Sequence, residues 1–126
     1  MLKHSKAFSS FSVNDTQQAK KFYIEILGLD AKDGMMGLLE LHIEGSNPIM
    51  IYPKPNHEPA TFTVLNFPVD DVEKTVDALI AKGIVFEQYT GQIQTNEKGI
   101  SVSPVGPKIA WFKDPAGNIF SILEKQ

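Results

Sequence analysis

The chain has 126 residues and a formal net charge of −3 at pH 7, from 12 basic and 15 acidic residues. This length fits one domain, and the absence of any basic run argues against a nucleic-acid partner. Because the sequence contains no cysteine, disulfides, thiolate metal sites and thiol nucleophiles are all excluded.

No segment of the sequence has the length and apolar composition of a membrane span. Residues 1–10 also lack the apolar core of a signal peptide. We therefore expect a soluble cytoplasmic protein without a membrane partner.

The first half of the chain begins with a predicted strand and helix. Residues 6–13 alternate in polarity, which indicates a strand. Asp15 then has the position of an N-cap, and Gln18 completes a capping box. Apolar residues follow at helical spacing up to Gly28, namely Ala19, Phe22, Tyr23, Ile26 and Leu27.

Two further strands are predicted after an unassigned stretch at 30–37. In the first, over 38–45, apolar residues alternate with Glu40, His42 and Glu44. The second, over 48–54, ends at a pair of prolines. The order in this half is therefore strand, helix, strands.

The pattern starts again after residues 54–60, which are predicted to form a linker. Strand 61–67 is followed by an Asp cap and a helix over 72–82. Residues 11–15 match residues 67–71 position by position, so the sequence indicates an internal duplication. A strand is predicted over 84–89.

Residues 90–107 are predicted to be a long loop, and loops of this length are often lids or disordered segments. Residues 108–124 then read as a closing hairpin around a type I turn at 114–117, in which Gly117 takes the left-handed conformation. This turn places Trp111 opposite Ser121. It also creates one apolar face, formed by Ala110, Phe112, Phe120 and Ile122, and one mixed face suited to a cavity.

The duplication, the stretch FSVNDTQQAKKFYIEILGLD and the ending IAWFKDPAGNIFSIL together resemble the vicinal oxygen chelate superfamily of glyoxalases, bleomycin resistance proteins and extradiol dioxygenases. The resemblance covers nearly the whole chain. It implies an α+β fold in which one domain, residues 1–126, contains two βαβββ modules at about 5–53 and 61–125. The mixed sheet would curl into a cavity, with the helices outside. The resemblance also implies a homodimer.

Catalytic members of this superfamily hold a metal at four positions, usually with His, Glu or Gln. The resemblance places these positions at Phe8, about Met50, Val64 and Ser121. Hydrocarbon, thioether and neutral hydroxyl groups are poor ligands for hard or borderline divalent ions. We therefore expect neither a metal nor another cofactor.

His42, Glu40 and Glu44 share one face of their predicted strand. One interpretation is a solvated strand face, because charged residues are mostly exposed. In the fold that the resemblance implies, however, Glu40 and His42 would face the cavity and could orient a ligand. His4 and His57 are predicted to be solvent-exposed, and Asp15 is explained by capping.

We interpret the chain as a metal-free protein that binds a small organic molecule, planar or cationic, in a largely apolar, aromatic-lined cavity. The predicted lining residues are Phe8, Ser10, Met50, Tyr52, Val64, Asn66, Trp111 and Ser121.

Two alternatives stay open. The first is an enzyme: a lyase, isomerase or dioxygenase that holds a divalent metal with non-aligned residues such as Glu40 and His42. Such an enzyme could also work without a metal, with His42, Glu40 or Glu124 as the acid or base. The second alternative is a degenerate module that only makes protein contacts.

Overall fold

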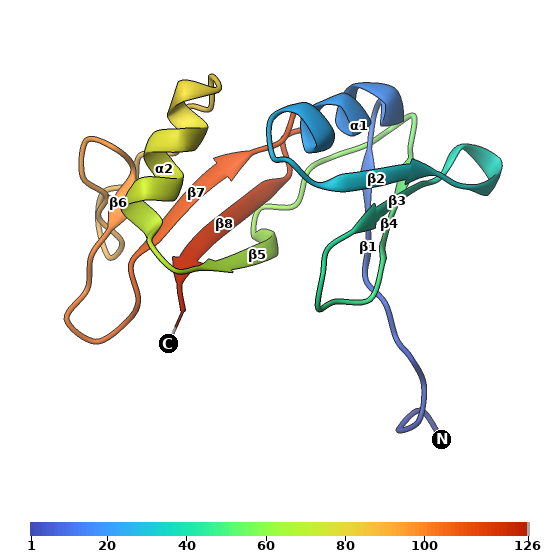
Figure 1. Ribbon diagram of the computed structural model, residues 1–126, viewed down its shortest axis with the longest axis horizontal. Coiled ribbons are helices and arrows are strands. Elements are labelled where there is room, and N and C mark those ends of the chain that lie inside the picture. The colour runs from blue at the N-terminus through green and yellow to red at the C-terminus, as the bar shows by residue number, and fades with distance from the viewer. Residues whose placement is uncertain (126) are drawn as a thin grey trace. The chain divides into compact units, whose positions relative to one another are not determined.

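The computed structural model describes residues 1–125. In it, the chain forms two compact units. Unit 1 comprises Met1–Pro59, and unit 2 begins at Ala60 (Figure 1). The boundary lies at the end of the predicted linker, where Pro and polar residues replace the periodic patterns.

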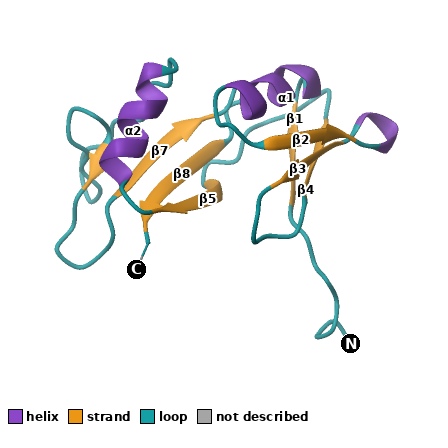
Figure 2. Ribbon diagram, in the orientation of Figure 1, coloured by secondary structure: helices purple, strands orange, loops and turns teal. Residues whose placement is uncertain are grey.

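Unit 1 combines one α-helix with a four-stranded mixed sheet (Figure 2). The strand order is β1-β4-β3-β2, with β1 parallel to β4 and the other pairs antiparallel. Its elements are β1 (Ser10–Val13), α1 (Thr16–Glu25), β2 (Asp30–Asp33), the short 3-10 turn η1 (Met35–Gly37), β3 (Leu39–His42) and β4 (Ile49–Pro53).

The core of unit 1 follows from the alternation of its strands. Leu39, Leu41 and Ile51 are completely buried, as expected when every second residue of a strand faces a packed helix. Helix α1 packs against β2 and β4 and contributes Ala19 and Tyr23 to this core. Consequently, the residues between the buried ones lie on the opposite face of the sheet.

Unit 2 repeats this architecture with the strand order β5-β8-β7-β6, in which β5 is parallel to β8. Helix α2 packs against β7 and β8. The elements are β5 (Thr63–Val69), α2 (Val72–Ala81), β6 (Ile100–Ser101), β7 (Ile109–Lys113) and β8 (Ile119–Glu124). The predicted α+β class and βαβββ modules are confirmed, and the strands form two mixed sheets that are not closed.

The duplication extends to the backbone of the helix caps. Asp15 has φ −143° and ψ 106°, and Asp71 has φ −141° and ψ 105°. The Asp15 carboxylate accepts hydrogen bonds from two backbone amides of the first turn of α1, and the Asp71 carboxylate accepts one from the amide of Lys74. Both aspartates are therefore explained by capping, as the sequence indicates.

The closing hairpin has the register that its turn predicts. Trp111 pairs with Ser121, and Phe112 pairs with Phe120. Gly117 takes φ 86°, which a residue with a Cβ rarely adopts, and its amide donates to the carbonyl of Asp114. The buried Asp114 carboxylate accepts hydrogen bonds from the backbone amides of Ala116 and Asn118.

Three sequence predictions are wrong in detail. The first strand begins at Ser10 rather than at residue 6, because its partner β4 begins at Ile49. Residues 84–89 bury Ile84 and Phe86 in alternation, but they do not form a strand. Instead, the two residues of β6, within the predicted 90–107 loop, pair with β7.

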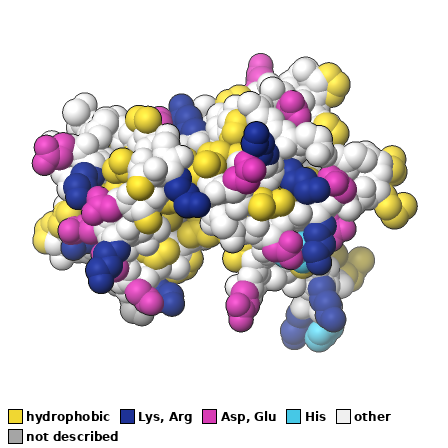
Figure 3. All heavy atoms as spheres, turned by 45° about the horizontal axis from the view of Figure 1, so that its top comes forward, with side chains coloured by type: hydrophobic (Ala, Val, Ile, Leu, Met, Phe, Trp, Pro, Cys, Tyr) yellow, Lys and Arg dark blue, Asp and Glu magenta, His cyan; other side chains and the backbone are white. Residues whose placement is uncertain are grey.

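The described surface carries intermixed charges. Figure 3 shows Lys side chains close to Asp and Glu side chains across the face that it presents. Several are ion-paired at distances from 2.8 Å, including Lys20 with Asp33 and Lys98 with Asp77. Within residues 1–125, no helix has both the length and the apolar character needed to cross a membrane.

Candidate functional site

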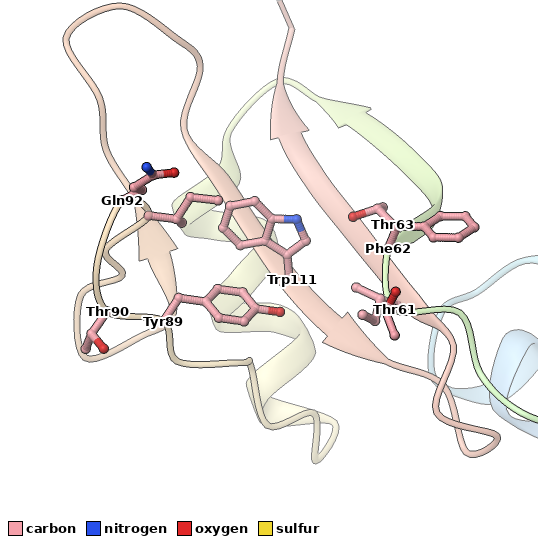
Figure 4. Close-up of a pocket in the computed structure, with 9 residues that line it drawn as sticks. Thr61, Phe62, Thr63, Tyr89, Thr90, Gln92 and Trp111 are labelled. Atoms are coloured by element: carbon pink, nitrogen blue, oxygen red, sulfur yellow. The ribbon is translucent and has the colours of Figure 1, made fainter.

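One candidate site is a pocket in unit 2, which we call the unit 2 pocket. Its volume is about 490 Å³, within the usual range for small-molecule sites. Its walls come from β5 and the segment before it, from β7 and β8, and from the loop that follows residue 88 (Figure 4). The lining residues are Thr61, Phe62, Thr63, Tyr89, Thr90, Gln92, Ile93, Trp111 and Ile119.

Trp111 and Tyr89 form the aromatic wall of the unit 2 pocket. Their ring centroids lie 5.4 Å apart at an interplanar angle of 76°, which is an edge-to-face contact. Trp111 reaches this position because β7 alternates, so that Ala110 and Phe112 are buried beneath α2 while Trp111 faces the other way. The amide of Glu87 also donates to the Trp111 carbonyl at 2.8 Å, which fixes the chain that carries Tyr89 beside β7.

The electrostatic surroundings keep the Tyr89 phenol in its neutral form. Burial raises the pKa of Tyr89 above its ordinary value of 10.0, and the negative charge of Glu87 raises it further. The positive charge of Lys113 acts in the opposite direction. Lys113 Nζ lies 3.5 Å from Glu87 Oε1, so these two charges largely compensate each other. The phenol is therefore available as a hydrogen-bond donor at neutral pH.

The predicted site residues of unit 2 lie on β5, β7 and β8. Trp111, Ser121 and Asn66 occupy neighbouring register positions, and the Ser121 hydroxyl donates a hydrogen bond of 2.5 Å to Asn66 Oδ1. Val64 lies at a bulge, because Thr63 pairs with Ile119 while Leu65 pairs with Phe120. Trp111 lines the unit 2 pocket, whereas the lining on β5 comes from Thr63.

The predicted site residues of unit 1 lie on the face of its sheet away from α1. Ser10, Met50 and Glu40 are neighbours in the register, and Tyr52 is opposite Ser12. Phe8 precedes β1 and is 64% exposed. Phe8, Glu40 and Met50 line a second pocket, of about 350 Å³, which we call the unit 1 pocket, together with Lys6, Asn47 and Pro48.

Glu40 and His42 are in contact on this face. His42 Nε2 lies 3.2 Å from Glu40 Oε1, and both side chains are about one-third exposed. Ser12 Oγ lies 2.6 Å from His57 Nδ1, a pairing that the sequence analysis missed by treating His57 as a solvent-exposed linker residue. Glu124, the third candidate acid, accepts a hydrogen bond of 3.2 Å from the amide of Val72 at the start of α2.

The four positions that the resemblance aligns with the metal positions of the superfamily carry side chains that do not fit a metal. In unit 1 they carry the ring of Phe8 and the thioether of Met50. In unit 2 they carry the hydrocarbon of Val64 and the hydroxyl of Ser121, which is already bonded to Asn66. Hard and borderline divalent ions prefer carboxylate and imidazole ligands. Among residues 1–125, moreover, no group of three or more His, Asp or Glu side chains could hold a metal ion.

Most of the unit 2 pocket was not predicted from the sequence. Tyr89 ends a segment of alternating polarity, so its ring beside Trp111 could have been suspected from that signal. Thr90, Gln92 and Ile93 belong to the predicted 90–107 loop, which has no periodicity. Thr61 and Phe62 belong to the predicted strand 61–67, but β5 begins only at Thr63, so strand alternation does not indicate which way these two side chains point.

Comparisons with known proteins agree with this architecture. The family model for the Glyoxalase/Bleomycin resistance protein/Dioxygenase superfamily matches residues 8–122. No curated protein sequence matches the chain.

Several solved structures have the same fold. A member of the glyoxalase/bleomycin resistance protein/dioxygenase superfamily from Sphaerobacter thermophilus has a TM-score of 0.72 and 20% identity, over 94% of this chain and 97% of that one. TnmS3, an antibiotic binding protein from Streptomyces sp. CB03234, has a TM-score of 0.66 and 23% identity, over 95% and 96%. Lactoylglutathione lyase from Agrobacterium tumefaciens has a TM-score of 0.67 and 21% identity, over 97% and 96%.

Proposed function

Because the chain belongs to the glyoxalase/bleomycin resistance protein/dioxygenase superfamily, we propose that it is a metal-free member that binds a small organic molecule in the unit 2 pocket. The observation that carries this proposal is the pair formed by Trp111 and Tyr89, which presents an aromatic wall to a pocket of about 490 Å³. Aromatic side chains provide a large apolar contact area at little cost in conformational entropy. The similarity in fold to TnmS3, an antibiotic binding protein, supports the proposal.

The donor chemistry at the four superfamily positions supports binding without a metal. Phe8 and Val64 offer no donor atom, and the Met50 thioether is a soft ligand. The Ser121 hydroxyl is occupied by its hydrogen bond to Asn66. Elemental analysis of the purified protein after dialysis should therefore find no transition metal in stoichiometric amount, and about one zinc, nickel, manganese or iron per chain would contradict the proposal.

Fluorescence titration tests the binding proposal directly, because Trp111 is the only tryptophan of the chain. A library of small aromatic compounds with little absorption at the excitation wavelength should contain members that quench or shift its emission in a saturable manner. N-acetyltryptophanamide provides the control for collisional quenching. If no compound gives saturable quenching, while the protein is folded by circular dichroism, the binding proposal fails.

The contact between Glu40 and His42 favours a second candidate function, which is acid–base catalysis at the unit 1 pocket. Glu40 lines that pocket and His42 does not, but His42 Nε2 lies 3.2 Å from Glu40 Oε1, so the imidazole could take a proton from a ligand through the Glu40 carboxylate. A metal at this location would have only these two protein ligands, fewer than the three of typical catalytic zinc sites.

Activity measurements on variants of His42 and Glu40 would test this second candidate. A reaction that depends on His42 should disappear in His42→Gln and fall in Glu40→Gln, whereas Trp111→Phe should leave it unchanged. Activity that survives His42→Gln would rule out His42 as the base.

A further inference from the structure

The unit 2 pocket is lined entirely by side chains that are uncharged at neutral pH. Three of the nine lining residues are aromatic, two are isoleucines, and the remaining four are three threonines and one glutamine. The charged groups that act on Tyr89 are Glu87 and Lys113, and these are paired with each other. The chain also contains no arginine, the residue best suited to bind a carboxylate or phosphate with two hydrogen bonds. The pocket therefore offers no counter-ion for a charged ligand.

Hydrogen-bonding groups nevertheless surround the aromatic wall. The hydroxyls of Thr61, Thr63 and Tyr89 and the amide of Gln92 all belong to lining residues. Figure 4 shows the phenol oxygen of Tyr89 pointing across the pocket towards the side that carries Thr61 and Thr63. Since burial raises the pKa of Tyr89, its phenol keeps its proton and can donate to an acceptor oxygen of a ligand.

The lack of charge is a property of this pocket and not of the module as such. In unit 1, Glu40 pairs with Met50, which in turn pairs with Ser10. In unit 2, Trp111 occupies the position of Glu40, because it pairs with Ser121, which lies beside Asn66. The unit 1 pocket contains the charged Lys6 and Glu40, whereas the unit 2 pocket contains an indole at the corresponding position.

We propose that the unit 2 pocket takes an uncharged, planar aromatic molecule that carries hydroxyl or carbonyl oxygens at its edge, and that it discriminates against anions. This inference rests on the proposed function, and it narrows the planar or cationic ligands suggested by the sequence to uncharged ones. The rings stack against Trp111 and Tyr89. The edge oxygens exchange their hydrogen bonds to water for hydrogen bonds to Tyr89 and the threonines. An anion would lose its hydration without gaining a counter-ion, because the nearby Lys113 is already paired with Glu87.

A matched series of bicyclic compounds tests this proposal by isothermal titration calorimetry at neutral pH. The compounds are 2-naphthol, naphthalene, 2-naphthoate and N-methylquinolinium. They are similar in size but differ in charge and in whether they carry an oxygen substituent. We expect 2-naphthol to bind about tenfold or more tightly than 2-naphthoate, because burial of an unpaired charge is costly. Naphthalene and N-methylquinolinium should both bind more weakly than 2-naphthol.

Two variants locate these effects. Tyr89→Phe should remove most of the preference for 2-naphthol over naphthalene, since it deletes the phenol donor. Gln92→Lys adds a positive charge on the exposed loop and should raise the affinity for 2-naphthoate. Gln18→Lys, which adds the same charge at an exposed position of α1 that lines neither pocket, is the matched control and should change neither result.

The outcomes separate this inference from the proposed function. Binding of 2-naphthoate or N-methylquinolinium as tightly as 2-naphthol would overturn the inference, while aromatic binding itself would stand. An unchanged preference in Tyr89→Phe would overturn the role of the phenol. If none of the four compounds, nor any member of the fluorescence library, binds to the folded protein, the proposed function itself fails.

Discussion

Trp111 faces the unit 2 pocket because a turn three residues later fixes its register. The turn at 114–117 pairs Trp111 with Ser121, so the indole lies on the mixed face of the hairpin and not in the core beneath α2. This position could be predicted from the sequence, since turn type determines register. The ring of Tyr89 could not, because its contact with Trp111 depends on how residues 84–89 run beside β7.

Replacement of Trp111 should therefore affect binding more than folding. We expect Trp111→Ala to weaken binding of an aromatic ligand by about 1 kcal/mol or more, and Trp111→Phe to weaken it less. Because the indole is only half-buried, its removal should lower the free energy of unfolding by less than the roughly 3–5 kcal/mol that removal of a fully buried aromatic side chain costs. Calorimetric titration and thermal melting of the same variants measure both effects. A large loss of stability with unchanged affinity per folded molecule would instead place Trp111 in the core.

Tyr89 gives a prediction about pH. Because the pKa of its phenol is raised in the folded protein, the unfolded chain loses this proton at a lower pH than the folded one. The contribution of Tyr89 to the free energy of unfolding should thus be complete below about pH 10 and decrease as the pH rises through the raised pKa.

The titration of phenolate absorbance, compared between the parent protein and Tyr89→Phe, isolates Tyr89 from the two other tyrosines. A difference curve with a midpoint at or below the ordinary value of 10.0 would contradict the assigned burial.

Among the elements, the helices and the closing hairpin were the most predictable. Each helix begins at an Asp cap and follows a regular apolar spacing, and the hairpin begins at a recognisable turn. The short strands were less predictable: β2 and the two-residue β6 are held by their partners β3 and β7 and carry little pattern of their own. Residues 84–89 show the reverse, since they have a strand pattern without forming a strand.

The hairpin turn should be a major source of stability for unit 2. Asp114 is buried, and its carboxylate accepts hydrogen bonds from the amides of Ala116 and Asn118 and from the Asn118 side chain, at 2.8–3.1 Å. We expect Asp114→Ala to cost roughly 2–3 kcal/mol in the free energy of unfolding, because it leaves buried donors without their acceptor. Asp71→Ala, which removes only a helix cap, should cost about 1 kcal/mol. Urea denaturation measures both, and a smaller loss for Asp114→Ala than for Asp71→Ala would refute this ranking.

For the whole molecule, the duplication and the family were readable from the sequence, whereas the location of the pocket was not. The repeated strand, cap and helix predict both modules. Of the ten predicted site residues, Phe8, Glu40 and Met50 line the unit 1 pocket and Trp111 lines the unit 2 pocket. The other six line neither of these pockets, namely Ser10, His42, Tyr52, Val64, Asn66 and Ser121. The loop at 90–93 completes the latter, and a loop without periodicity does not reveal which side chains turn inwards.

The resemblance that the sequence shows to the superfamily also leads us to propose a homodimer. The strand orders leave β1 and β2 at the edges of one sheet and β5 and β6 at the edges of the other, and edge strands are often covered by a partner. Light scattering at micromolar concentration should give about twice the chain mass of 14.0 kDa. A mass equal to that of one chain would show a monomer.

The central claim, that an uncharged aromatic ligand binds in the unit 2 pocket, is tested most directly by nuclear magnetic resonance of the labelled protein during titration with 2-naphthol. We expect saturable chemical-shift changes at the Trp111 indole and at the amides of Tyr89, Gln92 and Thr63, which line that pocket. The amides of Glu40 and Met50, at the unit 1 pocket, should remain unchanged and serve as the internal control. Changes confined to Glu40 and Met50, or no saturable change at Trp111, would contradict the claim.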